Sequence, residues 1–432
     1  MSSTRRPAEP SPPSTSPRVA LALAGGGPLG AIHEIGALCA LEEALPSLDF
    51  TTLNAYVGVS AGAFIAAGLA NGMTPRQMCA AFIESDGGAD DLIDPRLFTR
   101  PAWGEYRRRF ARLPGLLAQM GWQVLAGDLP PINALGQLGG ALPTGLFDNH
   151  GMQAQLERVF AVPGRTNDFR QLRRRLVVVA TDLDTGEAAP FGQPGWDDTP
   201  IARAIIASAA LPGLYPPVSI GGRHYVDGAL KKTMHASVVL DQGQDLLICL
   251  NPLVPFDASH RLDEPAEGER SGPRPTAHEG RIPHLAAAGL PAVMSQTFRT
   301  LIHSRLELGM KGYGISHPEC DIVLLEPDHH DPALFRAGTF SYTLRRELAE
   351  HAYQQTRRLL RNRCGELAPV FAEHGVPLDL DLLFRERRLL PKLALRRSGS
   401  DLAERTHQVL DQLEARLREI SPTLVERRAQ PR

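Results

Sequence analysis

The sequence has little of what would tie a chain to nucleic acid or carry it across a membrane. Its 46 lysines and arginines nearly balance 48 aspartates and glutamates, which leaves a formal net charge of −2 over 432 residues. Such a balance offers no overall attraction to a polyanion, so we expect no nucleic-acid partner. No apolar run is long and unbroken enough to span a bilayer, since even residues 61–73 are short and interrupted by glycines.

Cysteine is scarce, and its spacing fits neither disulfide bridges nor a metal site. The five residues are odd in number, scattered, and contain no C-x-x-C pair; they are Cys39, Cys79, Cys249, Cys320 and Cys364. This pattern argues against a disulfide framework and against a zinc site, and it favours a reducing compartment. Residues 1–17 contain two arginines followed by prolines and serines, where a signal peptide needs an apolar run. We therefore expect a disordered tail. The expected location is cytoplasmic, with peripheral contact to a membrane left open.

Two successive segments read as a strand, a glycine turn and a helix. Residues 18–45 pass from a short apolar run through a glycine cluster to helical spacing, and residues 53–73 repeat the pattern. Apolar runs at 175–183, 245–253 and 320–327 have the composition of strands buried on both faces. The predicted fold is α/β, a three-layer sandwich with a mostly parallel central sheet.

The remaining segments are less regular. Residues 98–147 mix proline, glycine and aromatics with helical fragments and are predicted to be a lid-like or substrate-facing insertion. Residues 257–283 are charged and rich in proline and glycine, which predicts a mobile surface loop. The expected organisation is therefore a tail (1–17), a catalytic domain (18–335) and an arginine-rich helical extension (340–432).

The segment "GVSAG", Gly58 to Gly62, is a G-x-S-x-G motif. Its two glycines allow a sharp strand-to-helix turn that lifts the Ser60 hydroxyl above the edge of a sheet. The helix that follows favours negative charge at Ser60. The alternative is that Ser60 only caps that helix, a common role for serine.

The segment "GGGPLG", Gly25 to Gly30, offers backbone N–H groups in a concave turn suited to an oxyanion or a phosphate. It also fits the G-x-G-x-x-G pattern of dinucleotide sites. The acidic residue at the expected separation, Asp49, lies before the second strand instead of after it, and no Lys-Ser/Thr pair marks a P-loop. An oxyanion hole is therefore the better interpretation.

A nucleophilic serine needs a base within hydrogen-bond reach. Asp227 in "YVDGA" is the candidate, because Gly228 permits a tight turn that points the carboxylate inward. An Asp-Gly pair can also be no more than a turn. A histidine triad is the other alternative, with His33, His224, His235 or His317 as the base, although only one predicted strand precedes the serine where α/β-hydrolases have several.

Four ordered segments, "GGGPLG", "GVSAG", "ASAALPGLYPPV" and "VDGA", resemble the blocks of patatin-like phospholipases over residues 18–254. These lipid acyl hydrolases use a Ser-Asp dyad without histidine. The resemblance implies that Ser60 is the nucleophile and Asp227 the general base. It also implies an oxyanion hole formed by Gly25, Gly26, Gly27, Leu29 and Gly30.

The chain departs from the family at this turn, because the family commonly has lysine or arginine where Leu29 stands and Pro28 has no N–H to donate. The implied activity is hydrolysis of fatty-acyl esters of phospholipids or lysophospholipids, without metal or organic cofactor. The alternatives are a soluble esterase, thioesterase or depolymerase, and a non-catalytic lipid-binding scaffold.

A basic cluster near the C-terminus has two interpretations, a solvated helix face or a patch that contacts anionic lipid. It contains Arg385, Arg387, Arg388, Lys392, Arg396 and Arg397.

Overall fold

The computed structural model describes residues 17–86, 97, 99–126, 142–257, 285–331 and 344–390. The chain divides into two compact units, Met1–Leu389 and Leu390–Arg432, and all secondary structure below belongs to the first unit. Most of the predicted tail, most of the loop at 257–283 and the part of the predicted extension after residue 390 lie outside the described residues.

The centre of the first unit is an eight-stranded mixed sheet in the order β5-β6-β3-β2-β1-β7-β8, with β4 paired to β3 beside this path. The strands are β1 (Val19–Leu23), β2 (Ala55–Gly58), β3 (Arg175–Asp182), β4 (Ala188–Phe191), β5 (Val218–Ile220), β6 (Arg223–Asp227), β7 (Leu246–Leu250) and β8 (Asp321–Leu325). The five strands predicted from apolar runs are β1, β2, β3, β7 and β8, and they are mutually parallel. The three strands added by the structure pair antiparallel at the β3 side.

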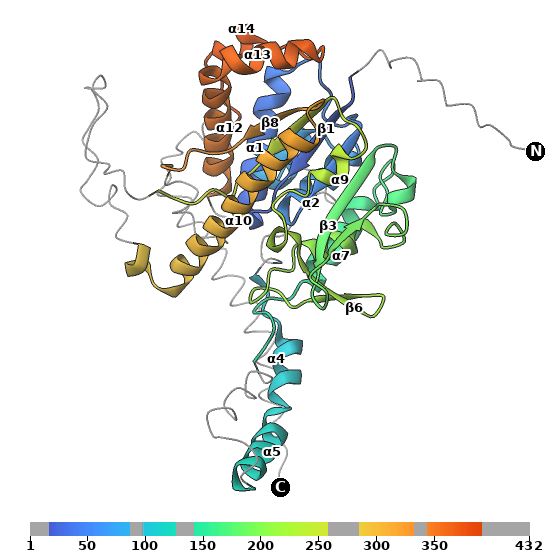
Figure 1. The fold of residues 1–432 in the computed structure, drawn as a ribbon, viewed down its shortest axis with the longest axis vertical. Coiled ribbons are helices and arrows are strands. Elements are labelled where there is room, and N and C mark those ends of the chain that lie inside the picture. The colour runs from blue at the N-terminus through green and yellow to red at the C-terminus, as the bar shows by residue number, and fades with distance from the viewer. Residues whose placement is uncertain are drawn as a thin grey trace, which may run out of the picture. The chain divides into compact units, whose positions relative to one another are not determined.

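Helices cover both faces of the sheet (Figure 1), so the predicted three-layer architecture is confirmed. The longer helices are α1 (Gly27–Ala44), α2 (Ala61–Ala70), α4 (Trp103–Phe110), α5 (Leu113–Leu125), α7 (His150–Phe160), α8 (Ile201–Ser208), α10 (Leu290–Ser316), α12 (Arg345–Asn362) and α13 (Cys364–Glu373). The short ones are α3 (Pro75–Met78), α9 (Ser237–Leu240), α14 (Leu380–Phe384), η1 (Cys79–Glu84), η4 (Phe169–Gln171), η5 (Gly228–Leu230) and η6 (Leu285–Ala288).

The core divides according to the alternation of side chains along the strands. In β1, Ala20 and Ala22 join the apolar cluster that contains Ile302 and Leu306 of α10, so α10 packs on that face. The alternating residues, Leu21 and Leu23, are fully buried on the opposite face. Helix α1 is apolar on nearly all sides and is buried almost throughout, as a helix between two layers should be.

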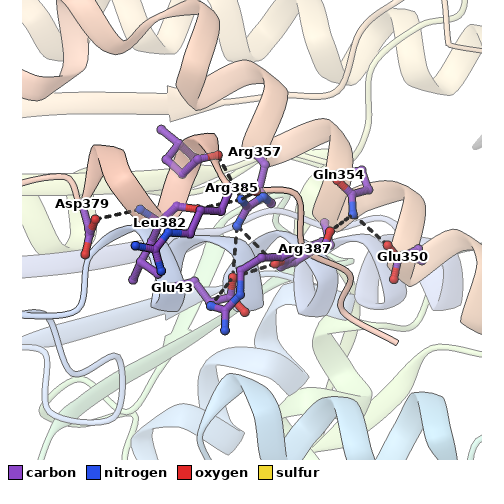
Figure 2. A network of polar contacts seen from close by, with 10 residues as sticks. Glu43, Glu350, Gln354, Arg357, Asp379, Leu382, Arg385 and Arg387 are labelled. Atoms are coloured by element: carbon purple, nitrogen blue, oxygen red, sulfur yellow. Dashed lines mark hydrogen bonds and ion pairs between the residues drawn. The ribbon is translucent and has the colours of Figure 1, made fainter. Parts of the chain in front are cut away.

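The outer cover of α1 is α12, which is followed by α13 and α14 in the same compact unit. Fully buried Arg357 of α12 donates to the carbonyl oxygens of Leu382, Leu383 and Arg385 and forms an ion pair with Glu43 of α1 at 3.1 Å (Figure 2). This network fastens the segment after α12 to α1. Residues 345–389 are thus part of the first compact unit, and they form the described part of the predicted extension at 340–432.

Candidate active site

The two glycine motifs meet at one edge of the sheet. Strands β1 and β2 are parallel neighbours with Leu23 beside Gly58, so the turns after them leave the sheet side by side. A Cβ placed on Gly25 would lie 3.1 Å from the Ser60 Cβ and 3.4 Å from the Ala229 Cβ. The turns that carry Gly25, Ser60 and Asp227 therefore converge at the carboxyl ends of the strands, where such sheets build their sites.

Ser60 occupies a strained backbone position between β2 and α2, with φ 54° and ψ −120°. A side-chain-bearing residue adopts this conformation at a cost of about 1–3 kcal/mol, and such strain is concentrated at functional sites. The flanking glycines are required by close approach, because a Cβ on Gly58 would lie 2.5 Å from the Ala63 Cα and one on Gly62 would lie 2.5 Å from the Leu23 carbonyl oxygen. Although Ser60 is the N-cap residue of α2, its side chain makes no capping hydrogen bond.

Ser208, at the end of α8, holds the turn at Ser60 by hydrogen bonds. Its fully buried hydroxyl accepts a hydrogen bond from the Ser60 N–H at 2.8 Å and donates one to the Val179 carbonyl oxygen at 2.6 Å. The contact ties the strained turn to β3. Sequence reasoning missed this residue, because a serine in "ASAALPG" carries no local signal of a partner 148 positions away.

Asp227 ends β6, and its main chain is held by a hydrogen bond from its N–H to the Ala210 carbonyl oxygen at 3.1 Å. Its buried carboxylate accepts a hydrogen bond from the Ala229 N–H at 2.9 Å, and the Ser60 side chain lies close enough to lower its pKa. Burial raises the pKa of Asp227 from 3.8 to about 6, while the Ala229 N–H and the Ser60 side chain oppose that rise. The carboxylate is thus a stronger base than an exposed aspartate.

The glycine turn forms the start of α1, with Gly26 as N-cap residue and Gly27 at φ 60°. The Gly30 N–H donates to the Gly26 carbonyl oxygen at 3.0 Å, so it is committed to the helix instead of being free for an oxyanion. Within the described chain, the N–H groups of Gly25, Gly26, Gly27 and Leu29 have no such bond. The first turn of a helix favours an anion at these donors.

The histidines weighed as bases lie elsewhere. His33 is buried in α1, and burial lowers its pKa to about 4. The His235 ring contacts the Gly228 carbonyl oxygen at 3.2 Å, and burial likewise lowers its pKa to about 4. His224 lies on β6, and His317 contacts Asp241 at 3.1 Å. Among the described residues, none of the four is hydrogen-bonded to Ser60 or Asp227.

Asp49 is not placed to serve as the acidic residue of a dinucleotide site. The Asp49 carboxylate accepts hydrogen bonds from the Thr51 N–H at 2.8 Å and hydroxyl at 2.7 Å, in the turn that precedes β2. It thus lies toward the amino end of that strand, whereas the glycine turn lies at the carboxyl end of β1.

The basic cluster is not a helix face where it is described. Helix α14 ends at Phe384, and Arg385 to Arg388 follow it in irregular backbone; Lys392, Arg396 and Arg397 lie outside the described residues. Arg387 forms an ion pair with Glu43 at 3.4 Å and belongs to the network around Arg357 (Figure 2). No helix in the described part of the chain is both long and apolar enough to cross a membrane.

Comparison with known proteins places these features in a family. The family model described as patatin-like phospholipase matches residues 21–239, which contain both glycine turns, Ser60 and Asp227.

Similar solved structures include VipD from Legionella pneumophila, at 15% identity and a TM-score of 0.34 over 81% of this chain and 67% of VipD. The type III effector protein ExoU matches at 16% identity and a TM-score of 0.34 over 88% of this chain. A complex of SpcU with ExoU from Pseudomonas aeruginosa matches at 16% identity and a TM-score of 0.25 over 84% of this chain. This chain spans 55% of the length of the chain in the structure of ExoU alone and 59% of the matched chain in the complex with SpcU. Since the family model covers about half of the chain and includes all four motifs, the chain belongs to the patatin-like phospholipase family.

Proposed function

We propose that this protein is a serine hydrolase that cleaves fatty-acyl esters of phospholipids or lysophospholipids through an acyl-Ser60 intermediate. The observation that carries the proposal is the placement of the strained Ser60 beside the buried Asp227, next to a turn with free N–H donors. The family supplies the substrate class, since its members act on lipid acyl groups.

The first half-reaction forms the acyl-enzyme. The Ser60 Oγ attacks the ester carbonyl carbon while its proton passes to the Asp227 carboxylate, and the carbonyl oxygen becomes an oxyanion. N–H groups of Gly26, Gly27 and Leu29 stabilise that oxyanion, and each such donor is worth on the order of 10²-fold in rate. The tetrahedral intermediate then collapses, the bond to the alcohol oxygen breaks, and Asp227 returns its proton to that oxygen.

The second half-reaction releases the fatty acid. Water attacks the acyl carbon and gives a proton to Asp227, the bond to the Ser60 Oγ breaks, and the proton returns to Ser60. The pKa of about 6 suits both steps, because the carboxylate is ionised near neutrality and still basic enough to accept a proton.

A fluorophosphonate probe followed by a panel of ester substrates tests this function. Wild-type protein is expected to be labelled at Ser60 and to hydrolyse phospholipid or lysophospholipid esters. Ser60→Ala is expected to lose both activities and to keep its fold, because removal of one hydroxyl leaves the apolar packing unchanged. Hydrolysis that survives in this variant contradicts the assignment. Turnover of short soluble esters or thioesters alone identifies the soluble-esterase alternative, and no turnover with an unlabelled Ser60 identifies a scaffold.

We also propose that the protein meets its substrate at a lipid surface through part of the predicted insertion. The described helices α4 and α5 expose large apolar residues next to arginines, a composition suited to the interface of an anionic bilayer. This α4–α5 surface consists of Trp103, Phe110, Leu117 and Trp122 with Arg107, Arg108 and Arg112. Backbone hydrogen bonds from Leu146 to Gly213 and from Phe147 to Leu214 tie the base of the insertion to the segment after α8.

Tryptophan fluorescence tests this contact, because two of the three tryptophans lie on the α4–α5 surface and the third, Trp196, packs against Phe191. Anionic vesicles are expected to shift the emission to the blue, and Trp103→Ser with Arg108→Glu should weaken co-sedimentation. The matched control is Arg396→Glu with Arg397→Glu, which samples the basic C-terminal cluster. Loss of vesicle binding in the control alone assigns the contact to that cluster instead.

A further inference from the structure

A second group of chemically active side chains lies outside the proposed ester site. It is the His303 cluster, formed by His303 of α10, Glu326 directly after β8, and His329 in the loop that follows. One potential ligand atom from each of the three residues lies within 4.8 Å of the others. We propose that this cluster binds one divalent ion of the zinc class.

The geometry is close to that of a metal site. The His303 Nε2 and a Glu326 carboxylate oxygen are 3.4 Å apart. Ligands bound tetrahedrally to zinc at about 2.0–2.2 Å are separated by roughly 3.4 Å, so an ion can be bound with little movement of this pair. The rings of His303 and His329 meet edge to face with centroids 4.9 Å apart, which brings a second imidazole to the same place.

The second observation is an unsatisfied nitrogen. His303 is 9% exposed, and its Nε2 has no hydrogen-bond partner among the described residues. Burial of a polar atom without a partner is costly, and such an atom calls for an explanation such as an unseen ion. The nitrogen faces Glu326, where a cation would satisfy both groups.

The surroundings supply the outer contacts that metal sites commonly have. The other ring nitrogen of His303 lies 4.0 Å from a carboxylate oxygen of Glu307, and Asn251 donates to Glu326 at 2.6 Å. A hydrogen bond such as the one from Asn251 orients a ligating carboxylate, and Glu307 places negative charge beside the imidazole. Two imidazoles and one carboxylate are a donor set that zinc accepts, and three protein ligands leave one coordination position open.

The bound ion would brace α10 against the loop after β8, because its ligands come from both segments. The ion would also be connected to the proposed ester site by a single turn of the chain. Asn251 follows β7, and the next residue, Pro252, packs against the glycine turn, with its Cγ 2.8 Å from a Cβ placed on Gly26. The proposal is independent of the reaction at Ser60.

Metal titration of the full chain, stripped with a chelator, tests the inference. Calorimetry with Zn²⁺ is expected to show one tight site, and Co²⁺ should give visible absorption bands of a low-coordinate nitrogen and oxygen site. Saturating Zn²⁺ should also raise the unfolding temperature, since it binds the folded state. Mg²⁺ is expected to do neither, because it prefers oxygen ligands in octahedral geometry.

Variants separate this cluster from the other histidines. His303→Gln, Glu326→Gln and His329→Gln should each weaken Zn²⁺ binding at least about tenfold, since even outer contacts of metal sites have effects of that size. The matched control is His330→Gln, which changes the neighbouring histidine and should leave the affinity unchanged. His329 is only half-buried, so its variant should fold even if that of His303 does not. Equal Zn²⁺ affinity in wild type and His329→Gln, or no binding by wild type, overturns the proposal.

Discussion

Asp227→Asn is expected to remove activity and, at neutral pH, to stabilise the fold. Burial raises the pKa of the Asp227 carboxyl to about 6 in the folded state. In the unfolded chain an aspartate titrates near 3.9, so the folded protein holds a proton over an interval of about two pH units in which the unfolded chain has lost it. Stability therefore falls as the pH rises through this interval.

The magnitude follows from the size of that interval. Two pH units correspond to about 3 kcal/mol, which is an upper limit for the destabilisation caused by the ionised carboxylate at pH 7. Asparagine carries no charge, and its side-chain oxygen can still accept from the Ala229 N–H. The variant should thus exceed wild type in unfolding free energy by up to about 3 kcal/mol at pH 7, and the two should converge below about pH 4.

Urea denaturation at pH 7 and pH 4 measures this difference, with ester hydrolysis measured in parallel. Hydrolysis by wild type should decline about tenfold per pH unit below pH 6, whereas the variant should be inactive throughout. Asp182→Asn is the matched control, because its 3.0 Å ion pair with Arg223 lowers the pKa of Asp182. That variant should lose stability at pH 7, and its deficit should shrink as the pH falls. The reasoning is refuted if the Asp227→Asn protein is less stable than wild type at pH 7. It is also refuted if the unfolding free energies of the two proteins differ by the same amount at pH 7 and at pH 4.

Three further predictions concern other contacts. Ser208→Ala removes the hydrogen-bond partner of the Ser60 N–H and of the Val179 carbonyl oxygen. We expect a stability loss of about 1–3 kcal/mol and a fall in kcat larger than the change in KM. An unchanged kcat would show that the conformation of the Ser60 turn does not depend on Ser208. His235→Asn should keep hydrolysis within about one order of magnitude, because the ring contacts a backbone carbonyl and not the dyad; inactivity in a folded variant would reinstate a histidine base. Arg357→Met leaves three carbonyl groups without their buried donor and removes one of the partners of Glu43, so calorimetry should show a stability loss of about 3–5 kcal/mol. A loss below 1 kcal/mol would mean that the network in Figure 2 contributes little.

The local physics of the sequence was enough to predict the central strands and the two glycine turns. Parallel strands buried on both faces require continuous apolar runs, and β1, β2, β3, β7 and β8 have them. A strained turn with a close approach on each side requires glycine, which is why Gly58 and Gly62 flank Ser60 visibly. These requirements act within a few residues, so they can be read from a short window of sequence.

Contacts between distant segments could be found only in the tertiary structure. The support of Ser60 by Ser208, the closure of α12 over α1 through Arg357, and the approach of His303 to Glu326 each join residues that no local pattern connects. The short antiparallel strands β4, β5 and β6 are stabilised by their partners in the sheet more than by their own composition. The sequence thus determined which residues are candidates for the proposed chemistry, because strand burial and turn geometry restrict residue type locally. The folded chain decided what surrounds them, because burial, hydrogen-bond partners and the raised pKa of Asp227 depend on side chains brought together from distant parts of the chain.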